Sequence, residues 1–322
     1  MRLCGDINLQ ARPDPTSAFS RVRDQLVTAD ILFGDLEMCL HDPSARIPNK
    51  PDWIQSEARM VEGLVGVGFD VVGCANNVHF GADSILSSLD VLEKHGIAHT
   101  GSGANEREAR APAILERSGI RVGFLAYTAV FFPFDHAAGP DSPGVSTIKC
   151  HTAYEPHPRV YELPGAPAIT RSWPDEAALD RVKREVVDLK RRVDTVVTYF
   201  HWGVSGVDEL AEYQPIIAHA VVDAGADLVV GSHAHRPQGI EIYKQKVVFY
   251  GLGNFAFDWP KMRKHRKGLV ATCALDSQGI SRVSFQPVWR HDDELNQPEI
   301  VALDDPKGRE IVERVLHLSA PL

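Results

Sequence analysis

Five short apolar runs of this sequence each end in side chains that can bind a metal ion. The side chains are carboxylates, carboxamides and imidazoles. In chain order they are Asp6 and Asn8; Asp35 and Glu37; Asn76, Asn77 and His79; His201; and His233 and His235. Such a set suits hydrolysis by two divalent metal ions, which a bridging carboxylate holds about 3.5–4 Å apart. The imidazoles favour Mn, Fe or Zn over Mg and Ca, which prefer shells of oxygen ligands.

The secondary-structure elements that carry these side chains must bring them together. The runs "DILFGDLE", "FDVVGCANN", "TVVTYF", "ADLVVGSHAH" and "KVVFYGLGNFAF" are typical of strands, and a hairpin is expected around Ser118–Gly119. Helical spacing lies between them, near residues 18–29, 57–67, 84–95, 175–193, 215–224 and 307–318. This alternation predicts an α/β fold. In an open α/β sheet the strand ends that bind ligands lie along one edge, so we expect the polar endings to converge there.

The apolar residues show neither helical nor strand periodicity between about residues 131 and 173, where Pro, Gly and His are frequent. Long aperiodic segments inside compact domains are usually lids, walls of a site or linkers. Tyr154, Tyr161 and Trp173 favour an ordered segment with buried aromatic side chains. We therefore expect this insertion to form a wall or lid of the substrate site and to determine specificity.

Composition limits the partners. The chain of 322 residues carries a formal net charge of −9, which argues against nucleic acid as the main partner. Its five cysteines have no paired spacing, so free thiols in a reducing compartment are expected. The N-terminus lacks a signal-peptide pattern and no run is long enough for membrane insertion, which predicts a cytoplasmic protein. The oligomeric state is not predicted.

The ordered motifs "GDIN", "GDLE", "ANNVH", "HWG", "GSHAH" and "YGLGNFAFD" resemble the CapA family of poly-γ-glutamate capsule proteins, a branch of the calcineurin-like metallophosphoesterase superfamily. The resemblance extends from Leu3 to about Asp258. It implies a four-layer α/β/β/α sandwich with a dinuclear metal centre. On this basis residues 1–322 are expected to form one domain that carries the insertion at about 131–173.

The resemblance also implies a role for the metal-binding side chains at the ends of the strands. Asp6 would bind the first metal, with Asn8 at a position where many superfamily members have histidine. Asp35 matches the bridging aspartate, although Glu37 is a second candidate for the bridge. The remaining ligands would be Asn77, His201 and His233 for the second metal and His235 for the first. His79 matches the general acid imperfectly, because Val78 intervenes, and is either that acid or a mere neighbour.

Each residue also has a structural alternative. Asp6 and Asp35 could cap helices, and His233 and His235 could form a turn bonded to backbone. Asn254 is expected to shape a turn rather than to bind metal.

Two further side chains are candidates for binding an anionic substrate. Arg236 follows His235 directly and can hold carboxylate or phosphate in a bidentate way. Trp202 could stack on substrate or pack in the core. The basic run Lys261–Lys267 is either a solvated loop or a further anion contact.

Two functions remain open. One is a metal-dependent hydrolase that cleaves a phosphoester, or an amide or other acyl bond, of a small-molecule or polymer anionic substrate. The other is a non-catalytic component of poly-γ-glutamate-type polymer assembly.

Overall fold

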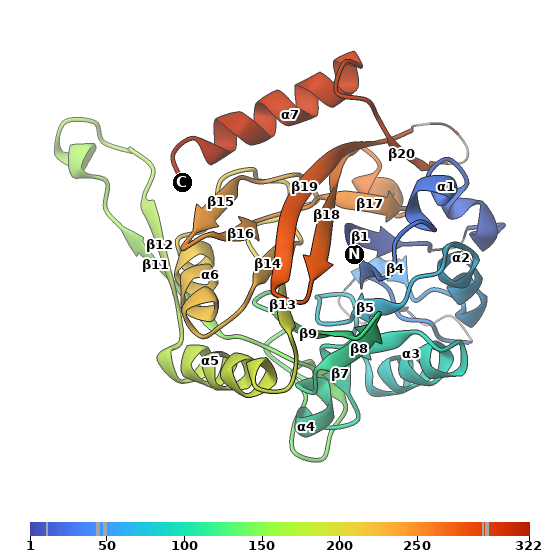
Figure 1. Ribbon diagram of the computed structural model, residues 1–322. Coiled ribbons are helices and arrows are strands. Elements are labelled where there is room, and N and C mark those ends of the chain that lie inside the picture. The colour runs from blue at the N-terminus through green and yellow to red at the C-terminus, as the bar shows by residue number, and fades with distance from the viewer. Residues whose placement is uncertain (11, 43–45, 48–49, 292, 294–295) are drawn as a thin grey trace.

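Two β-sheets form the centre of the molecule in a computed structural model, which describes all residues except 11, 43–45, 48–49, 292 and 294–295 (Figure 1). Within the described residues the first sheet has eight strands, and β17 pairs with β1 beside the main path. The path runs β20 (Pro298–Ile300), β19 (Gly279–Arg290), β18 (Lys267–Asp276), β1 (Arg2–Asn8), β2 (Leu32–Leu36), β5 (Val71–Gly73) and β6 (Ala98–Thr100), with β17 at Asn254–Phe257. Strands β17, β1, β2, β5 and β6 are parallel, so their carboxyl ends share one edge.

The second sheet has six strands among the described residues. Their order is β15 (Ile240–Tyr243), β16 (Lys246–Phe249), β14 (Leu228–Ser232), β13 (Thr195–His201), β9 (Ile120–Thr128) and β8 (Ala113–Arg117). Strands β16, β14, β13 and β9 are parallel. The predicted hairpin joins β8 to β9, and Ser118 and Gly119 adopt the positive φ values, 53° and 77°, that a tight hairpin turn requires.

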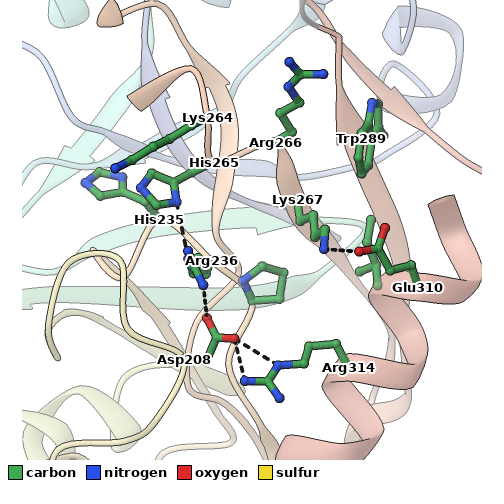
Figure 2. Close-up of a pocket in the computed structure, with 12 residues that line it drawn as sticks. Asp208, His235, Arg236, Lys264, His265, Arg266, Lys267, Trp289, Glu310 and Arg314 are labelled. Atoms are coloured by element: carbon green, nitrogen blue, oxygen red, sulfur yellow. Dashed lines mark hydrogen bonds and ion pairs between the residues drawn. The ribbon is translucent and has the colours of Figure 1, made fainter. Parts of the chain in front are cut away.

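A C-terminal helix, α7 (Pro306–Ser319), packs against β19 and β15 after an N-cap at Asp305. Its residues Glu310 and Arg314 face a pocket that β18 and β19 also line (Figure 2). The prediction of a helix near 307–318 is confirmed.

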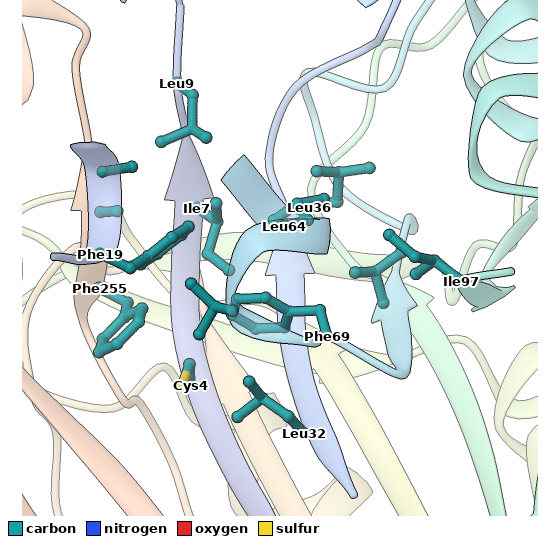
Figure 3. Close-up of a cluster of buried hydrophobic side chains, with 14 of the residues drawn as sticks. Cys4, Ile7, Leu9, Phe19, Leu32, Leu36, Leu64, Phe69, Ile97 and Phe255 are labelled. Atoms are coloured by element: carbon teal, nitrogen blue, oxygen red, sulfur yellow. The ribbon is translucent and has the colours of Figure 1, made fainter. Parts of the chain in front are cut away.

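Three clusters of buried side chains define the layers. Between the sheets, Leu3 and Phe33 of the first meet Phe124, Val197 and Val230 of the second. On the outer face of the first sheet the cluster includes side chains of β1, β2, α2 (Val61–Val67) and α3 (Ala82–Lys94) (Figure 3). The outer face of the second sheet packs against α5 (Glu176–Lys190) and α6 (Tyr213–Asp223). The four-layer α/β/β/α sandwich that the resemblance implied is confirmed.

The helix boundaries follow local signals. Asp175 caps α5 by accepting a hydrogen bond from the Ala178 amide. Gly225 follows α6 with a φ of 114°, which confirms the predicted stop. The expected helix at 18–29 is wrong in extent, because η1 (Pro15–Phe19) and α1 (Arg23–Leu26) take its place. The remaining short elements are β3 (Arg46–Ile47), β4 (Lys50–Ile54), η2 (Ala58–Met60), β7 (Ser102–Gly103), α4 (Glu106–Ala109), β10 (Gly144–Val145) and η4 (Pro260–Met262).

The expectation of an aperiodic segment over 131–173 is wrong for its second half. β11 (Cys150–Glu155) and β12 (Ile169–Pro174) pair as an antiparallel hairpin that projects from the sandwich, with η3 (Pro158–Tyr161) near its tip (Figure 1). The expected burial of the aromatic residues is also wrong: Tyr154 and Trp173 are exposed, and Tyr161 is 94% exposed. Pairing of the two strands satisfies the backbone, so the hairpin orders these residues without a core.

No helix in the described part of the chain is long and apolar enough to cross a membrane. All five cysteines are free thiols, and all but Cys150 are buried.

Candidate metal centre

The parallel strand ends bring acidic and imidazole side chains from both sheets to one place. In the first sheet Asp6 of β1 lies in register with Asp35 of β2 and with Asn254 of β17. In the second sheet His201 ends β13 beside Ser232 of β14. All five side chains are fully buried.

A first group of donor atoms comprises Asp6, Glu37 and His235, whose ligand atoms lie within 4.8 Å of one another. His235 Nδ1 is 3.4 Å from Asp6 Oδ2 and 3.9 Å from Glu37 Oε2. The same nitrogen is 2.8 Å from Asn254 Oδ1, while Asn254 Nδ2 donates to the His265 carbonyl. Asn254 therefore presents an oxygen to this group, a contact that the sequence analysis missed by assigning the residue to a turn.

A second group comprises Asp6, Asp35 and His201, again within 4.8 Å of one another. His201 Nδ1 lies 3.0 Å from Asp35 Oδ2, and Ser232 Oγ donates to the same oxygen at 3.0 Å. On the other side of the ring, His201 Nε2 lies 2.6 Å from Asn77 Oδ1 and 2.9 Å from His233 Nδ1. His201 Nε2 thus faces Asn77 Oδ1 and His233 Nδ1, which can each donate an electron pair. This arrangement is typical of ligands around a cation.

Asp6 belongs to both groups, and its Oδ2 forms an ion pair with His235 Nδ1 at 3.4 Å. Neither of its carboxylate oxygens has a hydrogen-bond partner among the described residues. Burial raises the pKa of Asp6, and burial raises the pKa of the neighbouring Asp35 to about 7. Burying two neighbouring carboxylates is costly, and bound cations remove that cost. The donor groups could therefore hold divalent metal, and the geometry adds Asp6 to Asp35 and Glu37 as a candidate bridge.

The backbone after β14 explains how two histidines separated by one residue serve different groups. His233 and His235 have φ values of 87° and 55°, in the left-handed region that non-glycine residues rarely adopt. Such conformations cost on the order of 1–3 kcal/mol each and cluster at functional sites. His233 contacts His201, and His235 contacts Asp6 and Asn254, so the two histidines do not form a simple backbone-bonded turn.

Asn8 ends β1, two residues after Asp6, and is fully buried. Its Nδ2 donates to the Glu37 carbonyl at 2.8 Å, and its Oδ1 accepts from the Gln10 amide at 3.1 Å. The side-chain carboxamide of Asn8 therefore stabilises the backbone at Glu37. Both polar atoms of Asn8 therefore have backbone partners, and its role as a direct ligand stays a prediction.

Asn76 has a similar bracing role that the sequence analysis did not assign. Its Nδ2 donates to Asp35 Oδ1 and to the Leu36 carbonyl, and its Oδ1 accepts from the amides of Val78 and His79. These bonds shape the turn that presents Asn77 to His201. Neither Asp6 nor Asp35 caps a helix in the described chain.

His79 lies outside both donor groups. Its ring is fully buried, and its Nδ1 is 3.0 Å from the Cys74 carbonyl, which fixes a proton on that nitrogen. Burial lowers the pKa of His79 to about 3, so the imidazole is neutral at physiological pH. Nε2 has no hydrogen-bond partner among the described residues. The insertion reaches this region through His136, whose Nε2 lies 3.1 Å from the His79 carbonyl.

The two candidate substrate contacts differ in placement. Trp202 is fully buried, stacks on Phe200 with ring centroids 4.7 Å apart, and donates its indole hydrogen to the Tyr250 carbonyl. The interpretation as a substrate contact is therefore corrected to core packing. Arg236 instead lines the pocket of Figure 2, together with His235 and the basic segment Lys264–Lys267.

Comparison with known proteins gives a family match over most of the chain. The family model described as "Bacterial capsule synthesis protein PGA_cap" matches residues 2–259. Capsule biosynthesis protein CapA of Bacillus anthracis is 27% identical over 257 residues, covering 78% of this chain and 56% of that protein. PGA biosynthesis protein CapA of Bacillus subtilis is 27% identical over 280 residues, covering 86% and 66%. An uncharacterised protein of Sinorhizobium fredii is 27% identical over 285 residues, covering 74% and 61%.

The chain thus spans about three fifths of the length of these relatives. Among solved structures, a hypothetical protein from Thermus thermophilus aligns with a TM-score of 0.50 at 12% identity. That alignment covers 89% of this chain and 98% of the other. At this identity the likeness concerns the fold alone.

Proposed function

Because the chain belongs to the family of bacterial capsule synthesis proteins (PGA_cap), we propose that it is a metal-dependent hydrolase of an anionic substrate in polyglutamate-type polymer metabolism. The bond cleaved is a phosphoester or an amide. Both sheets contribute donor atoms to the centre, so residues 1–322 are proposed to act as one functional domain.

The observation that carries the proposal is the buried carboxylate of Asp6, shared by two donor groups. Asp6, Glu37 and His235 would hold one ion, with Asn254 beside them. Asp6, Asp35 and His201 would hold the other, with Asn77 and His233 against His201. The histidines favour Mn, Fe or Zn. When bound, such a pair activates a water molecule and neutralises charge that develops on the substrate oxygens.

The chain's own residues fix the geometry that this chemistry needs. Ser232 and Asn76 each donate a hydrogen bond to Asp35, one to each carboxylate oxygen. They orient the carboxylate before anything binds, as partners behind metal ligands commonly do. Burial of the centre excludes bulk water and strengthens electrostatic interactions within it.

A second candidate is a non-catalytic component of polymer assembly that keeps the fold and the metals. The placement of His79 favours it, because a neutral, fully buried imidazole tied to the Cys74 carbonyl is a poor proton donor to a leaving group. The names of the Bacillus relatives refer to biosynthesis and also agree with this candidate.

Metal analysis coupled to a substrate screen separates the two. Purified protein saturated in turn with Mn, Fe and Zn is expected to hold two ions per chain. It should hydrolyse at least one of p-nitrophenyl phosphate, bis-p-nitrophenyl phosphate, γ-glutamyl-p-nitroanilide and a γ-linked oligoglutamate. Asp35→Asn should reduce that rate by orders of magnitude with the fold retained. Two ions without turnover on any of these substrates would favour the assembly component, and fewer than one ion would refute both.

A further inference from the structure

A pocket of about 340 Å³ adjoins the candidate metal centre, and His235 belongs to both. We call it the cationic pocket and define it by Arg236, Lys264, Arg266, Lys267 and Arg314, together with Asp208. Figure 2 shows Arg236 and Arg314 on either side of Asp208, with Lys267 and Glu310 farther along the same wall. A molecule whose reacting bond lies at the metals could extend into this pocket past His235.

The pocket is positively charged although the protein is acidic. Its lining holds five lysine and arginine side chains and two acidic ones, Asp208 and Glu310. Lys267 pairs with Glu310, and Asp208 is shared by two arginines. The formal net charge of the chain is −9, so this local excess of cations is not a general property of the surface. Such an excess attracts an anion.

Asp208 shows which anion the two arginines are spaced to hold. Its Oδ1 lies 3.1 Å from Arg236 Nη1, and its Oδ2 accepts from Arg314 at 2.9 Å (Nε) and 2.7 Å (Nη2). One carboxylate therefore fits between both guanidinium groups. The side chains of Arg236 and Arg314 are still 45% and 41% exposed, whereas that of Asp208 is 13% exposed. Both arginines thus keep accessible surface for a second carboxylate.

Most of the pocket lies outside the segment that matches the family model. That match ends at residue 259, whereas Lys264, Arg266, Lys267 and Arg314 come from the basic run, β18 and α7. Of the residues that define the pocket, only Asp208 and Arg236 fall within the match. The elements that follow residue 259 thus add the cationic wall to the shared metal-centre scaffold.

We propose that the cationic pocket is the subsite that recognises a carboxylate group of the molecule bound at the metal centre. The proposal rests on the proposed function only in placing that molecule at the metals. The incoming carboxylate shares Arg236 and Arg314 with Asp208, and Trp289 and Pro237 supply apolar wall for the carbon chain that carries it. A substrate with regularly spaced carboxylates, such as a γ-linked glutamate oligomer, has the required chemistry.

Titration calorimetry of the 322-residue chain with γ-linked tetraglutamate tests the proposal without requiring turnover. Arg314→Gln should weaken binding about tenfold or more, because it removes a charge-assisted hydrogen-bonding partner. Arg309→Gln is the matched control on the same helix, since Arg309 is exposed and bonds the Asp304 carbonyl outside the pocket. It should change binding less than about twofold. Asp208→Asn should tighten binding, because the competing carboxylate is gone.

Two further probes identify the anion. The carboxamide analogue of the tetraglutamate should bind at least about tenfold more weakly than the acid. Inorganic phosphate should bind more weakly than the tetraglutamate. The proposal is overturned if Arg314→Gln binds as tightly as Arg309→Gln, if the carboxamide binds as well as the acid, or if phosphate is the tighter Arg314-dependent ligand. Weakened binding after Asp208→Asn, in protein with an unchanged circular dichroism spectrum, would assign the aspartate a structural role and also overturn it.

The outcome is separable from that of the proposed function. Arg314-dependent binding without any turnover would refute the hydrolase and keep the subsite. Turnover with binding that is indifferent to Arg314 would refute the subsite and keep the hydrolase.

Discussion

Replacing Asp6 by asparagine should change stability in opposite directions in the metal-free and the metal-loaded protein. Both oxygens of Asp6 are buried and lack a hydrogen-bond partner in the described chain, and Asp35 is a second buried carboxylate of the same donor group. Burial raises the pKa of Asp6, so its negative charge destabilises the metal-free fold. Asparagine keeps the shape of the side chain and removes the charge.

The magnitudes are large enough to measure. An unpaired buried polar group costs roughly 1–3 kcal/mol, and a charged one costs more. Asparagine is still a buried polar group but carries no charge, so metal-free Asp6→Asn should be more stable than the natural protein by about 1 kcal/mol or more. A ligand at a hundred times its Kd adds about 2.7 kcal/mol to stability, or roughly 5 kcal/mol for two sites. Because Asp6 belongs to both donor groups, the variant should lose most of this gain.

Urea unfolding at pH 8 measures both effects, once with a chelator and once with saturating Mn²⁺ or Zn²⁺. Asp188→Asn is the control, because Asp188 is exposed on α5, belongs to neither donor group, and forms a surface ion pair with Arg191. It should behave like the natural protein in both conditions. The reasoning fails if Asp6→Asn is less stable than the natural protein without metal, or if metal stabilises the two equally.

Three further predictions address other parts of the molecule. A double substitution of His233 and His235 by alanine should lower metal content by elemental analysis from two ions to less than one, and retention of both ions would refute the two-metal interpretation. Burial raises the pKa of Asp227, but hydrogen bonds from two lysines outweigh it and hold that pKa below its usual value. Asp227→Asn should therefore cost about 1–3 kcal/mol at pH 7. That difference should vanish as the pH falls below about 4 and through the folded-state pKa, so an undiminished difference in urea unfolding at low pH would contradict it. Replacing residues 156–167 at the tip of the β11–β12 hairpin with a short turn should leave metal content and turnover unchanged, because that tip is exposed. A changed KM would instead support the expectation that this segment forms a wall or lid of the substrate site.

The sequence predicted much of the centre because the signals are local. Alternating apolar runs identify strands, and in a parallel sheet the residues after each strand lie at one edge. Asp6, Asp35, Glu37, His201 and His235 could therefore be placed together before their contacts were known. The β11–β12 hairpin escaped prediction, since its two strands are short, rich in polar residues and separated by Pro- and Gly-containing sequence.

The predictions of site residues were least accurate where they depended on the direction of a side chain. Asn8 and Trp202 stand beside predicted ligands in the sequence, yet Asn8 donates to the Glu37 carbonyl and Trp202 to the Tyr250 carbonyl, which only the fold brings near. Asn254 was set aside because its motif resembles a turn. Its place opposite Asp6 depends on the pairing of β17 with β1, strands that are about 250 residues apart.

The sequence alone thus determined which chemical groups the protein carries and which strand ends present them, since both follow from residue type and short-range periodicity. Tertiary structure decided which groups share a site. It made Asp6 common to both donor groups, and it set Arg314 of α7 opposite Arg236 beside the metal centre. These outcomes depend on the packing of two sheets and a C-terminal helix. Long-range contacts of that kind are fixed by the burial of whole layers rather than by any local pattern of residues.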